Sequence, residues 1–135
     1  MMKKTEELKL SNTNNGVLGK IVQHPIDRIE TLPSKKAVKH VRAICGEVTA
    51  LCPVTGQPDI YTITIDYDVK EQRVIESKAL KLFLWQYRDV GISCEDLSAD
   101  IAQKLSEQYG AEVTVHARQQ SRGGIVLEST SEGSL

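Results

Sequence analysis

Residues 60–68 read IYTITIDYD and residues 76–89 read ESKALKLFLWQYRD, and the change of apolar period between these two segments decides the fold. In the first segment, β-branched and aromatic residues alternate with polar ones, so the odd-numbered residues share one face of a predicted strand. In the second segment, apolar residues such as Leu80 and Phe83 recur at three- and four-residue steps, which predicts an amphipathic helix. Gly91 interrupts this helical pattern.

The segments on either side of residues 60–89 predict the remaining helix and strands of a two-layer domain. We expect a second helix at 93–109 and further strands at 38–50, 111–119 and 125–128. Gly46 predicts an irregularity in the first of these strands, and Ser93 and Gly110 are residue types that begin and end a helix. The order β–β–α–α–β–β predicts an α+β fold, in which both helices cover one face of a four-stranded antiparallel sheet.

The length of the chain, 135 residues, predicts one domain with a tail at each end. Residues 1–16 are polar, with one Ser and three Asn residues, and predict a flexible N-terminal tail. We expect residues 17–128 to form the single folded domain, beginning with an extended arm at 17–36, and residues 129–135 to be a frayed C-terminal tail.

Charge and cysteine content narrow the class of protein. The 17 Lys and Arg residues balance 18 Asp and Glu residues, which argues against direct nucleic-acid binding. The sequence has no apolar run of membrane-spanning length and no signal-peptide pattern, so we expect no membrane contact. Its three cysteines predict free thiols and a cytoplasmic location. Cys and His residues are not closely spaced anywhere, so no metal site is predicted.

The segment CPVTGQPD at 52–59 places a thiol and a carboxyl group on one loop. Pro53, Gly56 and Pro58 cannot all lie within one regular element, so the loop has a defined shape. A nucleophile and an acid that face a common point are what addition chemistry requires. The alternative is a turn that contains a buried cysteine, with Asp59 accepting hydrogen bonds from backbone amides.

A second group of polar residues surrounds the start of the helix at 76–89. Lys78 and Lys81 lie three residues apart and therefore share a helix face, where they could hold the phosphates of a cofactor. Arg122, in the turn before two glycines, could add a third cation. The alternatives are a solvated lysine face and an ordinary turn arginine.

Together the loop and the helix resemble the motifs of the NADPH-dependent 7-cyano-7-deazaguanine reductases, the nitrile reductases of queuosine biosynthesis. The family's loop, Cys-Pro-x-Thr-Gly-Gln-Pro-Asp, is matched at 52–59, and its helix motif, Glu-Ser/Leu-Lys-Ser/Ala-hydrophobic-Lys, is matched at 76–81. The resemblance runs from about residue 32 to about residue 125. It implies the tunnelling fold, in which sheets of several subunits join into a barrel, and a homodecamer of two stacked pentamers.

The resemblance also implies roles for individual residues. Cys52 would attack the nitrile to form a thioimide, Asp59 would donate the proton, and two hydrides from NADPH would give the primary amine. Glu95 would accept hydrogen bonds from the base. The resemblance further implies cofactor contacts by Lys78, Lys81 and Arg122, and substrate contacts by Ile75, Glu76, Ser77 and Cys94.

The chain departs from the family pattern at two positions. Cys94 stands where the short reductases usually have His, and Ile60 stands where they usually have an aromatic residue. The first change removes a ring nitrogen that could bond the substrate, and the second removes a flat surface for stacking. Neither change affects the predicted nucleophile, acid or lysines.

Two other functions remain open from the sequence. One is a tunnelling-fold amidinotransferase, which uses the same Cys and Asp on a nitrile within a polynucleotide but lacks the Glu-Ser-Lys helix. The other is a non-catalytic purine-binding domain. The chain has no Gly-x-Gly-x-x-Gly fingerprint, so NADPH would bind outside a Rossmann fold.

Overall fold

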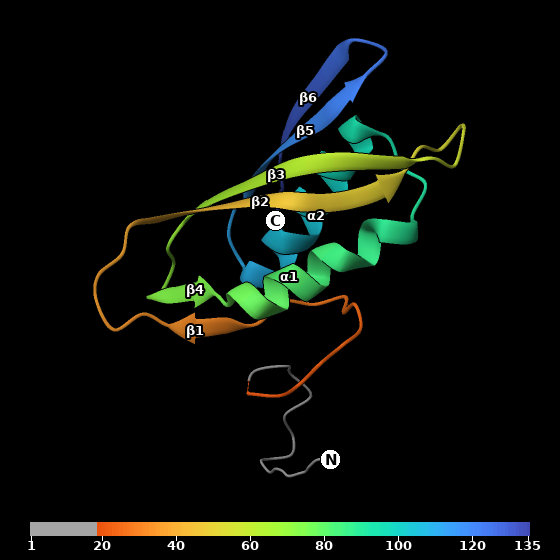
Figure 1. Ribbon diagram of the computed structural model, residues 1–135. Helices are drawn as coiled ribbons and strands as arrows, with labels where there is room; N and C mark the ends of the chain where they lie inside the picture. The colour runs from red at the N-terminus through yellow and green to blue at the C-terminus, as the bar shows by residue number, and fades with distance from the viewer. Residues whose placement is uncertain (1–18) are drawn as a thin grey trace.

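The computed structural model describes residues 19–135 (Figure 1). The predicted tail at 1–16 lies outside the described residues. The described elements, in chain order, are β1 (Thr31–Pro33), β2 (His40–Leu51), β3 (Pro58–Asp68), β4 (Arg73–Ile75), α1 (Ser77–Trp85), the short 3-10 helix η1 (Gln86–Asp89), α2 (Cys94–Tyr109), β5 (Thr114–Arg122) and β6 (Ile125–Glu132).

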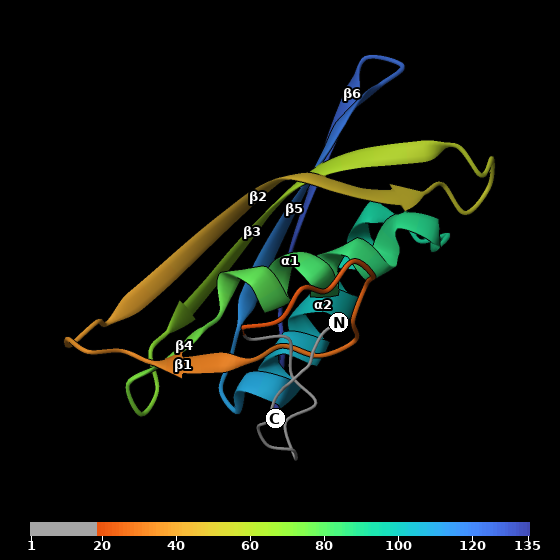
Figure 2. The same ribbon diagram turned by 60° about the horizontal axis from the view of Figure 1, so that its bottom comes forward.

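The main sheet has four antiparallel strands in the order β2-β3-β5-β6, and α1 and α2 lie on one face of it (Figures 1 and 2). This arrangement confirms the predicted α+β class and the helices on a single face. The pairing of β2 with β3 shifts register between Cys45 and Val48, which confirms the irregularity expected near Gly46. The other face of the sheet carries no helix in the part of the chain that the structure describes.

A second, two-stranded sheet of β1 and β4 was not predicted. Each strand has three residues, and such segments are too short for an alternating pattern to stand out. The chain before β1 also contacts the helices, because the Ile26 amide donates to the Leu82 carbonyl at 3.2 Å and the Ile29 amide donates to Gln108 Oε1 at 2.6 Å. Residues 19–36 are therefore held against the domain.

The core forms where the apolar face of β3 meets the two helices. The odd-numbered residues of β3 from Tyr61 to Tyr67 are at most 3% exposed, as their alternation predicts. Leu97, Ile101 and Leu105 form the matching stripe on α2 and are fully buried. The predicted face of each element is therefore the one that the structure buries.

The helix ends follow from their capping residues. Ser93 Oγ accepts the Asp96 amide at 3.2 Å to begin α2, and Gly110 ends it in a left-handed conformation, with φ 85°. At α1, the Glu76 carboxylate accepts the amides of Lys78 and Ala79, each at 2.9 Å. The helix predicted at 76–89 is divided at Trp85, because its last four residues form η1.

The expected frayed end at 129–135 is wrong for most of its length, because β6 continues to Glu132. Its small polar side chains suggested an unstructured end, but they allow a close approach to α2. Ser98 Oγ lies 2.9 Å from Ser129 Oγ and 3.0 Å from Ser131 Oγ, and the Gly133 amide donates to the Val113 carbonyl at 3.1 Å. The seam between α2 and β6 is therefore built from serine hydroxyls rather than from apolar side chains.

We expect Gly133→Ala to destabilise the domain by about 1–3 kcal/mol, because a side chain there overpacks the seam. An added Cβ would lie 2.0 Å from Ser106 Oγ and 2.3 Å from the Ala102 carbonyl oxygen. Gly46→Ala is the control, because nothing lies within 4 Å of a Cβ at that position. Thermal unfolding of both variants checks this. Equal unfolding temperatures for Gly133→Ala and the parent would contradict the close packing.

Within residues 19–135, no helix combines the length and the apolar character needed to cross a membrane.

Candidate active site

The loop between β2 and β3 has a defined shape held by its own backbone. The Cys52 amide donates to the Gln57 carbonyl at 2.8 Å, and the Gly56 amide donates to the Cys52 carbonyl at 2.9 Å. Gly56 has φ 74°, a left-handed conformation that favours glycine. On the other side, the backbone of Leu51 bonds Val90 and Ile92 in the segment that leads to α2. The loop is thereby fixed to the start of α2.

Cys52 carries the thiol that ionises most readily. The Thr55 hydroxyl, followed by the backbone amides of Thr55 and Val54, lowers the pKa of Cys52 by hydrogen bonding. The nearby Asp59 charge acts in the opposite direction. Burial raises the pKa of both Cys45 and Cys94. Because the thiolate is the nucleophile, Cys52 is the cysteine best suited to covalent chemistry.

Asp59 lies at the start of β3, and only 5% of the residue is exposed. Arg122, at the end of β5, forms an ion pair with Asp59 Oδ1 and donates to Gln57 Oε1 at 2.7 Å. The tip of the β5–β6 hairpin is thus tied to the loop. The structure therefore brings Arg122 to the predicted acid rather than to the two lysines.

Tyr61 is a buried residue of β3 that lies two positions after Asp59. Burial raises the pKa of Tyr61, and the charges of Asp59, Cys94, Glu95 and Cys52 act in the same direction. The Tyr61 hydroxyl donates to Gln119 Oε1 at 3.2 Å. From the sequence, Tyr61 was expected only to share a strand face with Ile63 and Ile65. That pattern does not indicate whether Tyr61 lies near the thiol.

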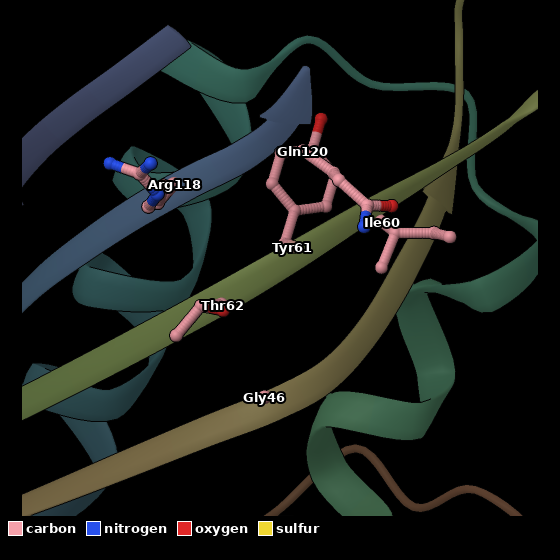
Figure 3. Close-up of a pocket in the computed structure, with 6 residues that line it drawn as sticks. All are labelled: Gly46, Ile60, Tyr61, Thr62, Arg118 and Gln120. Atoms are coloured by element: carbon pink, nitrogen blue, oxygen red, sulfur yellow. The ribbon is translucent and has the colours of Figure 1, made fainter. Parts of the chain in front are cut away.

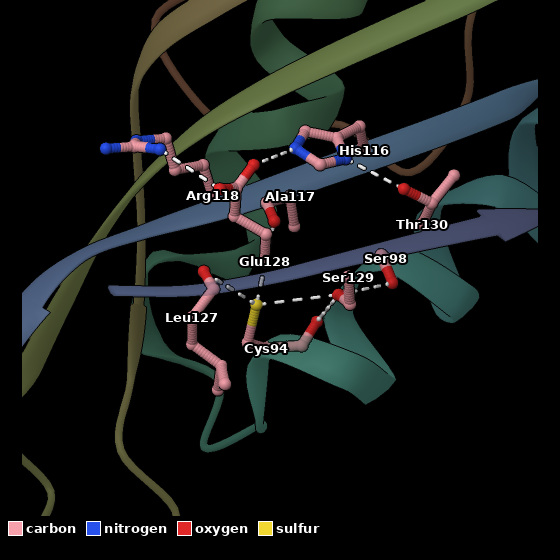
Figure 4. Close-up of polar contacts among 9 residues, drawn as sticks. All are labelled: Cys94, Ser98, His116, Ala117, Arg118, Leu127, Glu128, Ser129 and Thr130. Atoms are coloured by element: carbon pink, nitrogen blue, oxygen red, sulfur yellow. Dashed lines mark hydrogen bonds and ion pairs between the residues drawn. The ribbon is translucent and has the colours of Figure 1, made fainter. Parts of the chain in front are cut away.

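Cys94 and Glu95 begin α2 but face different surroundings. Glu95 is exposed, whereas Cys94 is 1% exposed. The Cys94 sulfur lies 3.5 Å from Ser129 Oγ and 3.8 Å from the Ala117 carbonyl oxygen, between the helix and strands β5 and β6 (Figure 4). A substrate could reach this sulfur only if the strands moved, so we leave Cys94 out of the proposed site.

The remaining predicted residues form a separate group at the start of α1. Figures 1 and 2 both place this end of the helix beside β4, at the far side of the domain from the loop that joins β2 to β3. Lys81 is exposed, and the Lys78 ammonium donates to the Lys20 carbonyl. The carboxylate of Glu76, predicted to contact the substrate, caps the helix. The group consists of Ile75, Glu76, Ser77, Lys78 and Lys81.

The helix-free face of the sheet has a hollow of about 230 Å³ (Figure 3). Ile60, which replaces the usual aromatic residue, lies in its wall, and Asp59 belongs to the opposite face of the same strand. The lining residues are Gly46, Ile60, Tyr61, Thr62, Arg118 and Gln120. None of the predicted site residues lines this hollow. Residues 19–135 also contain no group of three His, Cys, Asp or Glu side chains that could hold a metal ion.

Comparison with known proteins identifies the family. Residues 58–133, more than half of the chain, match the family described as QueF-like protein. The chain belongs to this family.

Curated relatives carry a functional name. The chain is 39% identical over 104 residues to the "NADPH-dependent 7-cyano-7-deazaguanine reductase" of Frankia casuarinae, and this match covers 76% of the chain and 82% of the relative. It is 35% identical over 114 residues to the protein of that name from Thiobacillus denitrificans, with 80% and 79% covered. The match to the Syntrophobacter fumaroxidans protein of that name, 42% identical, covers 65% of the chain and only 57% of the relative. The resemblance found in the sequence is confirmed.

A solved structure shows the same fold. The chain resembles "archaeosine synthase QueF-Like in the apo form" with a TM-score of 0.66 and 21% sequence identity, over 73% of this chain and 96% of that one.

Proposed function

We propose that this chain reduces the nitrile of 7-cyano-7-deazaguanine to 7-aminomethyl-7-deazaguanine in an NADPH-dependent reaction. The observation that carries this proposal is the loop at 52–59, which pairs a thiol of lowered pKa with a nearly buried carboxyl group. The relatives that share the loop and helix motifs bear the name of this activity. A cytoplasmic location remains a prediction from the free thiols.

The chain's own residues account for the first half of the reaction. Asp59 accepts the proton of the Cys52 thiol, and the resulting thiolate attacks the nitrile carbon and forms a C–S bond while Asp59 passes that proton to the nitrile nitrogen. NADPH, when bound, would supply two hydrides, which together with one further proton from solvent convert the resulting thioimide to an amine. Breakage of the C–S bond after the first hydride returns Cys52 as a thiolate. The exposed Glu95 accepts hydrogen bonds from the base and orients it.

We infer that the complete site forms between neighbouring chains. Within one chain, the loop and the group at the start of α1 lie at opposite ends of that helix, so a single chain does not bring them together. Pairing of the free edges of β2 and β6 between subunits would close a barrel and cover exposed edges. We expect a homodecamer of two stacked pentamers, with Ile75, Glu76 and Ser77 facing the neighbour's substrate. Light scattering measures the mass, and a monomer that turns over substrate would contradict this assembly.

The lysines are proposed to hold NADPH. Lys81 is exposed at the start of α1, where backbone amides and cations can face phosphate together, although the capping carboxylate of Glu76 limits this attraction. Arg122 has five donors, of which the structure uses two on Asp59 and Gln57, so it could also reach a phosphate.

We expect Lys78→Ala and Lys81→Ala to weaken NADPH binding by about ten- to a hundredfold, because each removes a charge-assisted contact. Binding of the nitrile and formation of the thioimide should be unchanged, because both precede hydride transfer. Lys104→Ala, which removes a lysine paired with Asp100 on α2, is the control. Titration with NADPH is the measurement. If both α1 variants bind NADPH with the affinity of the parent, Lys78 and Lys81 are solvated side chains that do not hold the cofactor.

Product analysis tests the proposed function against its alternatives. Incubation of the chain with the nitrile, NADPH and ammonia, followed by mass spectrometry, should yield the primary amine. An amidine would indicate an amidinotransferase. Binding without conversion of the nitrile would indicate a purine-binding domain.

A further inference from the structure

The carboxylate of Asp59 has a single side-chain partner among residues 19–135. Arg122 forms an ion pair with Asp59 Oδ1, and no hydrogen bond or ion pair of the described residues reaches Oδ2. The backbone of Asp59 pairs with that of Ala50, so the sheet holds the main chain at this position. The guanidinium of Arg122 is therefore the group that orients the carboxylate itself.

The same guanidinium also binds the loop that carries the nucleophile. Its second terminal nitrogen donates to Gln57 Oε1 at 2.7 Å, and the Gln57 carbonyl accepts the Cys52 amide at 2.8 Å. A guanidinium presents its donors in a rigid, planar fork, so two acceptors bound at once define its orientation. Arg122 therefore links the predicted acid to the loop segment that is bonded to Cys52.

A register shift brings Arg122 to this position. Arg118 and Gln120, two even-numbered residues of β5, line the hollow on the helix-free face. Arg122 is also even-numbered, but the pairing of β5 with β6 shifts between Gln119 and Arg122. An extra residue in one strand reverses the alternation of the side chains that follow it. Arg122 therefore reaches Asp59, which belongs to the opposite face of the sheet from Ile60 and the hollow.

The hairpin turn keeps Arg122 at the end of a paired strand. Gly123 and Gly124 have φ values of 60° and 82°, and the tight turn of a two-residue hairpin requires positive φ at both positions. Arg122 and Ile125 flank this turn as paired residues. The backbone of Arg122 is thus fixed by the hairpin, and its side chain is fixed by Asp59 and Gln57.

We propose that Arg122 is a positioning residue that acts through Asp59. This inference rests on the proposed function. The ion pair occupies Oδ1 and leaves Oδ2 to exchange the proton. The proton of the Cys52 thiol passes to Oδ2, the electron pair of the sulfur forms the C–S bond, a π pair of the nitrile moves to nitrogen, and nitrogen takes the proton from Oδ2. Asp59 and Arg122 are both unchanged at the end of the step.

This role differs from a phosphate contact in the step that it affects. Thioimide formation needs no NADPH, so a residue that only holds the cofactor has no influence on it. A group that transfers a proton must lie within hydrogen-bond reach of both atoms that it serves. Loss of the residue that orients Asp59 should therefore slow thioimide formation even when NADPH is absent.

The test measures thioimide formation at saturating nitrile without NADPH, by rapid quench and intact-protein mass spectrometry. Arg122→Met removes the guanidinium and keeps an unbranched side chain, and we expect the rate constant to fall about ten- to a hundredfold. The nitrile concentration that gives half of the maximal rate should stay nearly unchanged, because Arg122 acts on Asp59 and not on the base. The side chain of Arg122 is 40% exposed, so its replacement leaves the core intact.

Two further variants separate the positioning role from a general effect of charge. Arg122→Lys keeps a cation that can pair with the carboxylate, and it should recover part of the lost rate. Arg118→Met is the matched control, because it removes another arginine of β5, one that pairs with Glu128 on the helix-free face. Its rate of thioimide formation should equal that of the parent.

Thioimide formation at the parent rate in Arg122→Met would overturn the proposal, and weaker NADPH binding in that variant would then assign Arg122 to the cofactor alone. An equal loss in Arg118→Met, or no recovery in Arg122→Lys, would also contradict it. If the parent itself forms no thioimide, the proposed function fails, and this inference fails with it. If the parent forms the thioimide and Arg122→Met forms it equally fast, only the role of Arg122 is refuted.

Discussion

Cys52→Ala should abolish reduction of the nitrile and remove any covalent adduct. The variant leaves no thiol at the loop, and Cys45 and Cys94 are disfavoured as nucleophiles because burial raises their pKa values. Intact-protein mass spectrometry with the nitrile and without NADPH measures the adduct. The parent should gain the mass of one substrate molecule per chain, and the variant should gain none.

The matched control is Cys45→Ala, which removes a half-buried thiol on the strand that leads to the loop. This variant should form the adduct and turn over as the parent does. An adduct that survives in Cys52→Ala, or that maps to Cys45 or Cys94, would refute the assignment of the nucleophile.

Asp59→Asn should lower the rate of reduction by about 10²–10⁴-fold, because an amide cannot donate the proton that the nitrile nitrogen requires. The fold should persist, since the amide oxygen can still accept a hydrogen bond from Arg122. Initial rates of NADPH oxidation, compared at saturating substrate, measure the effect.

Asp66→Asn provides the control on the same strand. Asp66 lies on the helix-free face of β3, near the opposite end of the strand from Asp59. Its carboxylate bonds His40 and Arg42. It should leave the rate of reduction nearly unchanged. Equal losses in both variants would show that charge removal from β3, rather than loss of the acid, lowers activity.

Local sequence patterns predicted the framework of the domain because local physics determines it. The alternation in β3, the stripe on α2 and the caps Ser93 and Gly110 each depend on residues a few positions apart. The pairing of β1 with β4 was missed because it depends on contacts between distant three-residue segments. The extent of β6 was missed because its seryl side chains are used in contacts with Ser98, whereas in sequence they indicate exposure.

For the candidate site, as for the fold, the sequence predicted local motifs but not the contacts between distant residues. The loop motif predicted Cys52 as the nucleophile and Asp59 as the acid; in the structure the pKa of Cys52 is lowered and Asp59 is nearly buried, and both roles stay predictions. Arg122 and Asp59 are 63 positions apart in the sequence, so local spacing could not predict that they form an ion pair. The burial of Cys94 depends on the path of β6, which the sequence did not indicate.

The most direct test of the central claim is the stoichiometry of NADPH oxidation by the purified chain in the presence of 7-cyano-7-deazaguanine. We predict that two NADPH are oxidised for each 7-aminomethyl-7-deazaguanine formed, and that oxidation stops when the nitrile is exhausted. NADPH that remains unoxidised while the chain forms the Cys52 adduct, or no reaction of the nitrile with the chain, would contradict a nitrile reductase.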